Sequence, residues 1–595
     1  MVAPPPVRRW RLLPHDRSAV EQLARSLAAS PIVAQLLLNR GLHEADQARR
    51  FLAPQLKGLL PPSQLPGVPA AVERILRAVE QKHRICVYGD YDVDGVTGTA
   101  ILAQMLRLLG AQTDIYVPHR LEEGYGLNVD ALREIASGGT KMVVTVDCGI
   151  ASVREAEEAR RLGLELIITD HHEIKEQLPD AAVLVHPRLP GHDYPFGHLC
   201  GAAVAFKLAW ALAQQRCGGE KVTPQFRELL MDAVALAALG VIADVVPLHE
   251  ENRILVKAGL MRLMDQPPVG LKALAEIAEV DLKAGLRASD IGFRLAPRIN
   301  AVGRLGQAAV AVELLMTTRR ERAVDLARHF QYLNEMRQKL ERDTVQRARQ
   351  MLESEGRQHD PALVLASHDW HGGVVGIVAG RLAEQFGRPT LMITLPNPDA
   401  EGQAAHLAVG SGRSIPGVAL HQVLRACDDL LVAHGGHAAA AGFRLLPENV
   451  AAFRERFCRE VAGYFPDGMP TPEIVLDAET PLSTLTLSLV DHLGQLEPYG
   501  AENRKPLFLA GGLQLVGEPR KVGQGERHLS FRVRQGGTTL KAIAWNMADR
   551  VDELLSGGGT CSLAFTPKLN EWEGRKSVDL EVTDFQPGPE ARLVL

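Results

Sequence analysis

Three acidic residues at alternate positions, directly after an apolar run, constrain the fold of this chain more than any other feature. The run 85–88 has the composition of a buried strand, and it leads into Asp90, Asp92, Asp94 and then Gly95. Side chains at alternate positions of an extended chain point the same way, so the three carboxylates converge if the strand geometry persists. Neighbouring carboxylates repel one another unless a cation lies among them, and they favour Mg²⁺ or Mn²⁺. The stretch therefore predicts a metal site at the end of a strand.

A calcium-binding EF-hand loop is the alternative for this stretch, because it also opens with Asp-x-Asp-x-Asp-Gly. That loop requires a Glu at its twelfth position, which here is Ile101, and it follows a helix. The preceding run has a strand pattern, so the calcium loop is disfavoured.

Short apolar runs alternate with helical patterns from about residue 70 to residue 248. The runs are 85–88, 113–117, 142–146, 164–169 and 182–185, and helical patterns lie between them at 97–109 and 153–162. This alternation favours a mostly parallel sheet, in which ligands bind beyond the carboxyl ends of the strands. Polar residues stand at those positions, with Asp147 after one run and Asp170-His171-His172 after another.

Asp244 is a further acid in an unusual environment, since it lies alone within the apolar segment 236–248. A buried lone carboxylate is costly unless it is paired or bound to a metal. Taken singly, each of these acids is as compatible with a helix cap or an ion pair as with a metal ligand. Jointly, the strand-end acids, the buried acid and the His-His pair favour a site for two metal ions.

The remaining chain predicts four further regions. The first 70 residues have helical periodicity and predict a small helical lead-in that packs on the next domain. Residues 321–352 predict one long amphipathic helix, either a rigid connector between domains or a packing helix within one. Residues 361–463 form a second α/β segment, and short alternating strands beyond residue 471 predict a small β-barrel such as an OB-fold.

Glycine-rich motifs at 370–377, 410–414 and 435–442 punctuate the second α/β segment. Turns of this kind expose backbone N–H groups, which with Arg413 and His437 are suited to holding phosphates. A tight structural turn is the alternative for each motif.

Aromatic side chains in the last region are candidates for stacking on nucleic acid. OB-folds bind single strands through basic grooves and stacked aromatic rings. Phe531, Phe565 and Trp572 are the candidate rings, and a role in the barrel core is the alternative for each. Basic residues lie nearby in the sequence: Arg520, Lys521, Arg527, Lys541 and Lys568.

The bulk composition is that of a soluble globular protein of several domains, with 595 residues, 46% hydrophobic and 23% charged. No apolar run approaches a membrane span, and the N-terminal residues lack the apolar core of a signal peptide, so a cytoplasmic location is expected. Seven scattered cysteines without a CxxC pair indicate neither a disulfide framework nor a thiolate zinc site. The net charge of −5 neither indicates nor excludes nucleic-acid binding.

The ordered motifs resemble those of the DHH phosphoesterase superfamily. The resemblance is carried by the stretch 90–95, Thr145-Val-Asp147-Cys-Gly, Asp170-His171-His172 and Ala243-Asp244-Val-Val-Pro. Further motifs resemble the RecJ family of bacterial exonucleases within it, at 124–127, 298–305, 333–338, 370–378, 410–414 and 435–442. The resemblance covers almost the whole chain, with departures at Gly306-Gln307 and at 498–503, which reads Pro-Tyr-Gly-Ala-Glu-Asn.

The resemblance implies an α/β multidomain fold. Its parts are a helical N-terminal lead-in (1–70), a parallel-sheet DHH catalytic domain (71–320), a long connecting helix (321–355), a second α/β, DHHA1-type substrate-binding domain (356–465) and a C-terminal region with a β-barrel of OB-fold type (466–595). It also implies a channel between the two α/β domains.

The implied activity is that of an exonuclease specific for single-stranded DNA, degrading 5′→3′ and releasing mononucleotides in DNA recombination and repair. Two divalent ions, Mn²⁺ or Mg²⁺, are expected as cofactors. Single-stranded DNA with a free 5′ end is the expected substrate. A single-stranded-DNA-binding protein and a DNA helicase are the expected protein partners, without a membrane.

The expected metal ligands are Asp92, Asp94, Asp147, His171 and Asp244, with Asp94 or Asp147 bridging the two ions. Asp90 is either a further ligand or a residue behind the ligands. His172 is expected to contact the scissile phosphate or to protonate the leaving oxygen, so His172, Asp147 and Asp94 are the expected catalytic residues. The residues expected to bind DNA are Arg120, Arg298, Arg304, Ser411, Arg413, Gly435, Gly436, His437 and Trp572.

Two other functions remain for a chain of this pattern. A DHH phosphodiesterase for short oligoribonucleotides or cyclic dinucleotides usually lacks the long helix and the OB-like region. A non-catalytic replication scaffold has lost metal ligands, whereas every expected ligand is present here.

Overall fold

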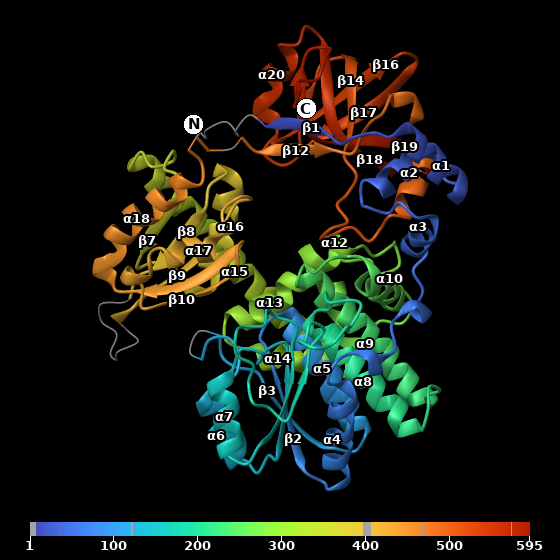
Figure 1. Cartoon of the computed structure of the whole chain (residues 1–595). Coiled ribbons are helices and arrows are strands. Elements are labelled where there is room, and N and C mark those ends of the chain that lie inside the picture. The colour runs from blue at the N-terminus through green and yellow to red at the C-terminus, as the bar shows by residue number, and fades with distance from the viewer. Residues whose placement is uncertain are drawn as a thin grey trace. The chain divides into compact units, whose positions relative to one another are not determined.

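The structure is a computed structural model that describes residues 8–120, 123–396, 406–466, 468–469, 471–572 and 574–594. The chain forms two compact units, which Figure 1 draws in one picture. The larger unit comprises Arg9–Tyr116, Gly126–Ala296 and Glu473–Leu595, and the smaller unit comprises Val117–Tyr125 and Pro297–Pro472. None of the helices in the described ranges is both long and apolar enough to span a bilayer.

A five-stranded parallel sheet lies at the centre of the first half of the larger unit. Its order is β3-β2-β4-β5-β6, and every neighbouring pair is parallel, as the alternating pattern predicts. The strands are β2 (Arg84–Gly89), β3 (Gln112–Tyr116), β4 (Met142–Val146), β5 (Glu165–Thr169) and β6 (Val183–Val185).

Helices cover both faces of this sheet, which explains why its central strands are apolar throughout. In Figure 1, α6 (Val129–Ser137) and α7 (Val153–Arg161) lie on one face, and α4 (Val68–Glu80), α5 (Val93–Leu108) and α8 (Gly201–Cys217) lie on the other. The chain moves outward from β2 to β3 and then returns to the other side of β2 with β4. The carboxyl ends of β2 and β4 therefore flank a topological switch point, the usual ligand site of such sheets.

Further helices follow the sheet in the chain. They are α9 (Pro224–Ala243), α10 (Glu250–Asp265), α11 (Val269–Ile277), α12 (Ala288–Asp290) and the π-helical turn η3 (Ile291–Leu295). Helix α9 is apolar around most of its circumference because it packs on both α5 and α10.

The N-terminal helices share their core with the C-terminal barrel. Helices α1 (Arg17–Leu27), α2 (Pro31–Leu38) and α3 (Ala45–Leu52) contribute to the same apolar cluster as the barrel strands. Strand β1 (Arg9–Leu12) pairs in parallel with β12 (Glu473–Leu476) and β20 (Leu593–Val594). The prediction that the lead-in packs on the next domain is confirmed for the turns after α3, where Leu60 N donates to Glu251 Oε1 at 2.9 Å, but α1–α3 have their core in the barrel. A stripe of apolar residues shows that a helix face is buried, and it does not show which part of the chain covers it.

The C-terminal strands close into a barrel. Their order is β13-β14-β18-β19-β17-β16-β15, and an additional pairing of β14 with β16 joins the two sides of the sheet. The strands are β13 (Ala478–Glu479), β14 (Phe508–Leu515), β15 (Arg520–Val522), β16 (His528–Gln535), β17 (Thr538–Ala544), β18 (Thr560–Trp572) and β19 (Arg575–Pro587). Two short helices, α19 (Leu487–Gly494) and α20 (Val551–Leu555), accompany them.

Two of the three predicted stacking rings are core residues. Phe531 is 4% exposed and Phe565 is 0% exposed, and both belong to the barrel core, so the prediction that they stack on nucleic acid was wrong. The side chain of Trp572 lies outside the described residues. Trp545, which the sequence reading did not select, is 48% exposed, and its ring meets that of His528 edge to face.

The smaller unit combines helices with a mixed five-stranded sheet of order β10-β11-β9-β8-β7. The strands are β7 (Leu363–Ser367), β8 (Thr390–Thr394), β9 (Ala408–Arg413), β10 (Ala433–Gly436) and β11 (Ala440–Leu445). The helices are α13 (Ala296–Arg304), α14 (Ala308–Met316), α15 (Arg320–Ser354), α16 (Gly372–Phe386), α17 (Leu420–Arg425) and α18 (Val450–Gly463). The long helix predicted at 321–352 is α15, and its last turns pack on α16.

Two of the three glycine-rich motifs of the smaller unit are not turns. The motif 435–442 does span a turn, the hairpin between β10 and β11, where His437 N donates to Ala440 O at 2.8 Å. Residues 410–413 belong to β9, and a Cβ at Gly410 would lie 2.1 Å from the Phe443 ring. The first glycines at 370–377 open helix α16, and Gly435 and Gly436 end strand β10. Glycine here permits close packing of a ring on a strand, which composition alone does not distinguish from a turn.

Removing a buried leucine from α2 should loosen the barrel. Leu36 is fully buried in the shared core, so we expect Leu36→Ala to lower the stability of that core by about 2–5 kcal/mol. Hydrogen exchange of the β16 and β17 amides should become correspondingly faster. Leu132→Ala, in the core between the parallel sheet and α6, is the matched control and should leave barrel exchange unchanged. Equal barrel exchange in both variants would contradict the shared core.

Candidate metal centre

The acidic stretch after β2 is a strand-to-helix turn. The strand ends at Gly89, and Asp92 is the N-cap of α5, with its Oδ1 accepting from the N–H groups of Asp94 at 2.9 Å and Gly95 at 3.1 Å. Asp94 thus lies in the first helical turn, so the extended geometry does not persist through it. The acids converge because the chain turns into a helix at this point. The unpaired N–H groups of the first helical turn donate hydrogen bonds to a carboxylate and stabilise its negative charge.

Asp94 is held at the N-terminus of α8. Its Oδ2 accepts from Gly201 N at 2.6 Å and its Oδ1 from Ala202 N at 2.9 Å. The positive end of the helix dipole favours the ionised carboxylate there. Helix α9 also approaches closely, because a Cβ at Gly240 would lie 2.4 Å from Asp94 Oδ1.

Asp147 follows β4 in a left-handed conformation, with φ of 64°. Its N–H donates to Thr169 O at 3.0 Å, and a Cβ at Gly201 would lie 2.7 Å from its Oδ1. A non-glycine residue in this region is strained unless its surroundings hold it, and such residues concentrate at functional sites. The backbone after β4 is thus set to turn this carboxylate toward α8.

Asp170 organises the two histidines that follow it. Its Oδ1 accepts from the N–H groups of His171 at 2.7 Å and His172 at 3.1 Å, and lies 2.7 Å from His172 Nδ1. Its Oδ2 accepts from Ile150 N at 2.9 Å. The sequence reading placed Asp170 in the motif but gave it no role, although its position before the histidine pair was the available signal.

The backbone carbonyls of both histidines are held from the other side. His186 Nε2 donates to His172 O at 2.8 Å, and Arg188 Nη2 donates to His171 O at 2.7 Å. The sequence reading missed both residues, since a histidine and an arginine after the short strand β6 carry no pattern of their own. With Asp170 they fix the orientation of the histidine pair.

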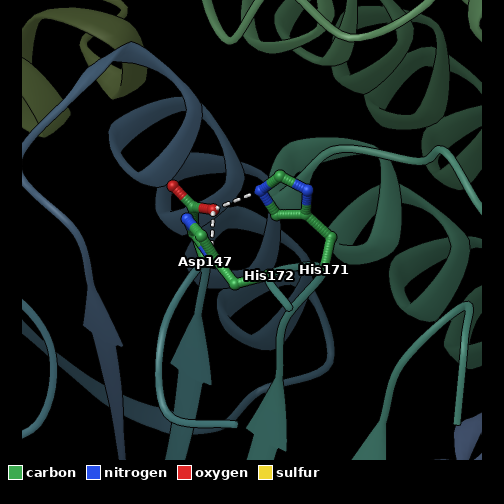
Figure 2. Close-up of side chains that lie close together, drawn as sticks. All are labelled: Asp147, His171 and His172. Atoms are coloured by element: carbon green, nitrogen blue, oxygen red, sulfur yellow. Dashed lines mark ion pairs between the residues drawn. The ribbon is translucent and has the colours of Figure 1, made fainter. Parts of the chain in front are cut away.

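His171 is the point where carboxylates from three elements meet. Its Nε2 lies 3.0 Å from Asp147 Oδ1, 3.6 Å from Asp244 Oδ2 and 3.7 Å from Asp94 Oδ2. Asp244 reaches the group from the C-cap of α9. Figure 2 shows ion-pair lines from one oxygen of Asp147, Oδ1, to both histidine rings, and His172 Nδ1 lies 3.8 Å from it.

The described residues form three overlapping groups whose ligand atoms lie within 4.8 Å of one another. They are Asp90 with Asp92 and Asp147, Asp94 with His171 and Asp244, and Asp147 with His171 and His172. All six expected ligands are brought together, including Asp90. Asp147 belongs to the first group and to the third, which is the arrangement expected of a residue between two ions.

The electrostatics of this cluster call for a cation. Burial, together with the charges of Asp94 and Asp92, holds the pKa of Asp147 well above its usual range. Burial and the same two charges raise the pKa of Asp244 to about 8. Such shifts measure the cost of crowding negative charge, which divalent cations offset.

The histidines differ in their protonation. Burial lowers the pKa of His171 to about 4, so it is a neutral imidazole at neutral pH. Burial also acts to lower the pKa of His172, but its hydrogen bond to Asp170 and the charge of that residue raise it to about 9. Burial acts to raise the pKa of Asp170, but its hydrogen bond to His172 and the charges of both histidines together keep that pKa well below its usual range, so Asp170 is ionised.

The donor set fits Mn²⁺ or Mg²⁺. The Nε2 atom of His171 is buried and has no hydrogen-bond partner among the described residues, which leaves its lone pair for a metal. Carboxylate oxygens are the preferred ligands of Mg²⁺ and also bind Mn²⁺, and a site of carboxylates with one neutral imidazole suits either ion. The EF-hand alternative is excluded, because the acids follow a strand and Ile101 is buried in α5.

Several residues predicted to bind DNA lie together in the smaller unit. Arg413 Nη1 is 3.5 Å from Ser411 Oγ on β9, and a Cβ at Gly376 on α16 would lie 2.9 Å from that Oγ. Burial and the nearby charge of Arg120 lower the pKa of Arg413. Two guanidinium groups near each other and partly buried favour an anion such as a phosphate.

The other predicted DNA contacts are more dispersed within this unit. Arg304 Nη1 donates to Gly373 O at 3.1 Å at the start of α16, and Arg298 Nε donates to Gln331 Oε1 at 2.8 Å on α15. Gly435, Gly436 and His437 are exposed at the end of β10. These residues belong to the smaller unit and the metal ligands to the larger one.

A parallel sheet with acids after β2 and β4, and with Asp-His-His after β5, defines a DHH-type phosphoesterase. The DHH family, N-terminal domain, matches residues 84–237, the DHHA1 domain matches 359–463 and the RecJ OB domain matches 476–584.

Relatives that match nearly the whole chain identify the family within this class. The chain is 38% identical to the single-stranded-DNA-specific exonuclease RecJ of Bacillus subtilis over 97% of this chain and 70% of that protein. It is 36% identical to the Escherichia coli protein of the same name over 94% of this chain and 96% of that one. The crystal structure of Thermus thermophilus RecJ in complex with Mn²⁺ superposes with a TM-score of 0.82 at 33% identity, covering 98% of this chain and 80% of that one. A Mg²⁺ complex of the same protein gives a TM-score of 0.76. The chain belongs to the RecJ family.

Mn²⁺ should stabilise the metal-free protein through this cluster. A ligand that binds only the folded state stabilises it by about 2.7 kcal/mol at one hundred times its dissociation constant. We therefore expect Mn²⁺ to raise the midpoint of thermal unfolding. In Asp147→Asn the metal-free midpoint should equal or exceed that of the unsubstituted chain, because one repelling charge is gone and Asn tolerates the left-handed backbone. The increment with Mn²⁺ should be lost.

Asp114→Asn is the control for this measurement. Asp114 lies on β3 in an exposed pair with Arg84, away from the cluster, so the variant should keep the full Mn²⁺ increment. An undiminished increment in Asp147→Asn would contradict the assignment of Asp147.

Proposed function

We propose that this protein is an exonuclease for single-stranded DNA that works with two Mn²⁺ or Mg²⁺ ions. The observation that carries the proposal is the cluster at the switch point of the parallel sheet, where Asp147 is shared between two groups of ligand atoms. Paired divalent ions in such a site activate water and stabilise the oxygen that leaves the phosphorus. The relatives that share the whole chain bear the name of this activity.

The ligands divide by position in this proposal. Asp90 and Asp92 hold one ion and Asp94, His171 and Asp244 hold the other, with Asp147 between them. Asp94 keeps its orientation through two N–H groups of α8 while its remaining lone pairs face the cluster. The bridging residue is thus Asp147, and Asp90 takes the part of a ligand.

His172 is the proton donor of the proposed reaction. Its Nδ1 is engaged by Asp170, so its other ring nitrogen, Nε2, is the one that can donate to a phosphate oxygen or to the departing oxygen. Asp170 stabilises the protonated ring, as its hydrogen bond and charge do here. The peptide groups held by His186 and Arg188 keep this ring in place.

Phosphates of the DNA are proposed to bind in the smaller unit. Arg120, Ser411 and Arg413 form one contact group, and Arg298, Arg304 and the exposed segment Gly435–His437 are further contacts. Trp545 replaces Phe531 and Phe565 as the stacking ring of the barrel, because its ring is exposed.

The proposal also covers the direction of cleavage, the roles of the domains and the cellular process. Cleavage proceeds 5′→3′ from a free 5′ end and releases mononucleotides. The residue ranges 71–320, 356–465 and 466–595 are the proposed catalytic, substrate-binding and OB-fold regions, with 321–355 connecting them. Recombination and repair in the cytoplasm, with a single-stranded-DNA-binding protein and a helicase as partners, are part of the same proposal.

Loss of a ligand should abolish cleavage and spare DNA binding. We expect His171→Ala and Asp147→Ala to leave no measurable degradation of end-labelled single-stranded DNA with Mn²⁺, because each variant lacks a proposed metal ligand. Binding of that DNA should persist, because neither residue is placed with the phosphate-binding group. Duplex DNA and short RNA are the parallel substrates, and chelator is the metal control. Preference for short RNA would favour the oligonucleotide phosphodiesterase, and absence of cleavage by the unsubstituted chain would favour the scaffold. Full activity of either variant would end the metal assignment.

Loss of a phosphate contact should weaken DNA binding and leave the metal ligands in place. Arg413→Gln should weaken binding of single-stranded DNA of any sequence and reduce the slope of log affinity against log salt by about 0.7, the value for one phosphate on a single strand. Arg425→Gln, on α17 of the same unit, is the control. An unchanged slope for Arg413→Gln would exclude Arg413 as a phosphate contact.

A further inference from the structure

The segment Gln495–Asn503 has no part in the proposed reaction. It lies between α19 and β14 of the C-terminal region and is drawn in orange in Figure 1. Its own hydrogen bonds close it into a compact loop. Asn503 Nδ2 donates to Leu496 O at 2.8 Å and Pro498 O at 2.7 Å, and the backbones of Gly500 and Asn503 exchange two further bonds.

Arg253 of α10 holds this loop through its backbone. The guanidinium is buried and donates to the carbonyls of Glu497 at 2.9 Å, Gln495 at 3.2 Å and Pro498 at 3.3 Å. It also donates to Phe51 O at 2.6 Å and lies 3.7 Å from the centre of the Phe51 ring. Helix α10 is thus tied to this loop and to α3 by one side chain.

The same loop contacts the turn that follows the metal ligand Asp244. Leu248 N donates to Ala501 O at 2.9 Å, and His249 Nε2 lies 3.1 Å from Glu502 Oε2. The Leu248 side chain is buried against Gly500, where a Cβ would lie 2.6 Å from Leu248 Cδ1. An added Cβ at position 500 would therefore have to displace the Leu248 side chain.

The turn itself is strained and needs such support. Val245, next to Asp244, has φ of 60°, and Glu250 has φ of 44°. A β-branched residue in the left-handed region is a genuine outlier, and it persists only where the surroundings determine the conformation. Those surroundings are Asn252, whose Nδ2 donates to Pro247 O at 3.1 Å, and the contacts of Leu248 and His249 with the loop.

We propose that the loop Gln495–Asn503 is a positioning element for Asp244. It holds the strained turn 244–249 so that the Asp244 carboxylate reaches His171, and it makes metal binding in the parallel-sheet domain depend on a segment more than 250 residues away in the chain. Gly500, Ala501 and Leu248 are positioning residues, since they act through the backbone of the turn. The inference rests on the proposed metal site, with Asp244 as one of its ligands.

The test is the affinity of the full-length, DNA-free protein for Mn²⁺, measured from the electron paramagnetic resonance signal of the unbound ion. Gly500→Ala should weaken binding about tenfold or more, the usual effect of losing a group that orients a metal ligand. Gly494→Ala, at the end of α19, makes the same change where nothing lies within 4 Å of the new Cβ, and it should bind like the unsubstituted chain.

A double-variant cycle separates positioning from a general loss of structure. In a Leu248→Ala background the Gly500→Ala substitution should have little further effect, because the side chain that it strikes is gone. Leu248→Ala alone should weaken binding less than Gly500→Ala, since the backbone bond to Ala501 remains. The thermal midpoint without metal, taken for each variant, shows whether the fold is intact.

The outcomes distinguish this proposal from the metal site itself. Asp244→Asn should weaken Mn²⁺ binding at least as much as Gly500→Ala. If Asp244→Asn binds Mn²⁺ normally, the assignment of Asp244 and the positioning role both fail. If Asp244→Asn is impaired but Gly500→Ala and Leu248→Ala are not, only the positioning role is overturned. The positioning role would also be overturned if Gly500→Ala weakened Mn²⁺ binding by the same factor in the Leu248→Ala background as in the unsubstituted chain.

Discussion

The mutual repulsion of buried carboxylates at the carboxyl ends of β2 and β4 is the constraint on which the rest of the larger unit depends. Three of these acids are held in place by the backbone: Asp92 and Asp94 accept from helix N-termini, and Asp147 is fixed by its left-handed backbone. Close approach of α8 and α9, at Gly201 and Gly240, completes the enclosure. The fold therefore concentrates negative charge that divalent cations can balance.

Asp170 sets the protonation of His172 at the same edge of the sheet. Their hydrogen bond gives one ionised carboxylate and one protonated ring beside a neutral His171. Adjacent residues thus take opposite protonation states because one ring meets Asp170 and the other meets the cluster. A metal ligand needs a free lone pair and a proton donor needs an N–H group, so the motif supplies both from a single turn.

The two ends of the chain are structurally one region. Strand β1 lies between β12 and β20, Trp10 Nε1 donates to Asp584 Oδ2 at 2.9 Å, and α1–α3 complete the barrel core. Removing residues 500–595 would therefore expose the apolar face of the N-terminal helices and also remove Ala501 and Glu502, the loop residues that contact the turn after Asp244. Such a truncation does not isolate DNA binding by the barrel, whereas a substitution of the exposed Trp545 would leave the barrel core intact.

The sequence by itself determined the parallel sheet, the long helix, the barrel and the set of residues in the metal cluster. It could do so because strand and helix periodicities are local and because acids after successive parallel strands must meet at one edge. Only the tertiary structure decided how Asp94 converges, that Phe531 and Phe565 are core residues, that α1–α3 pack on the barrel, and that Asp170, His186, Arg188 and the loop 495–503 orient the site. Those features arise from contacts between residues far apart in the chain or from backbone turns, and neither leaves a periodic trace in the sequence.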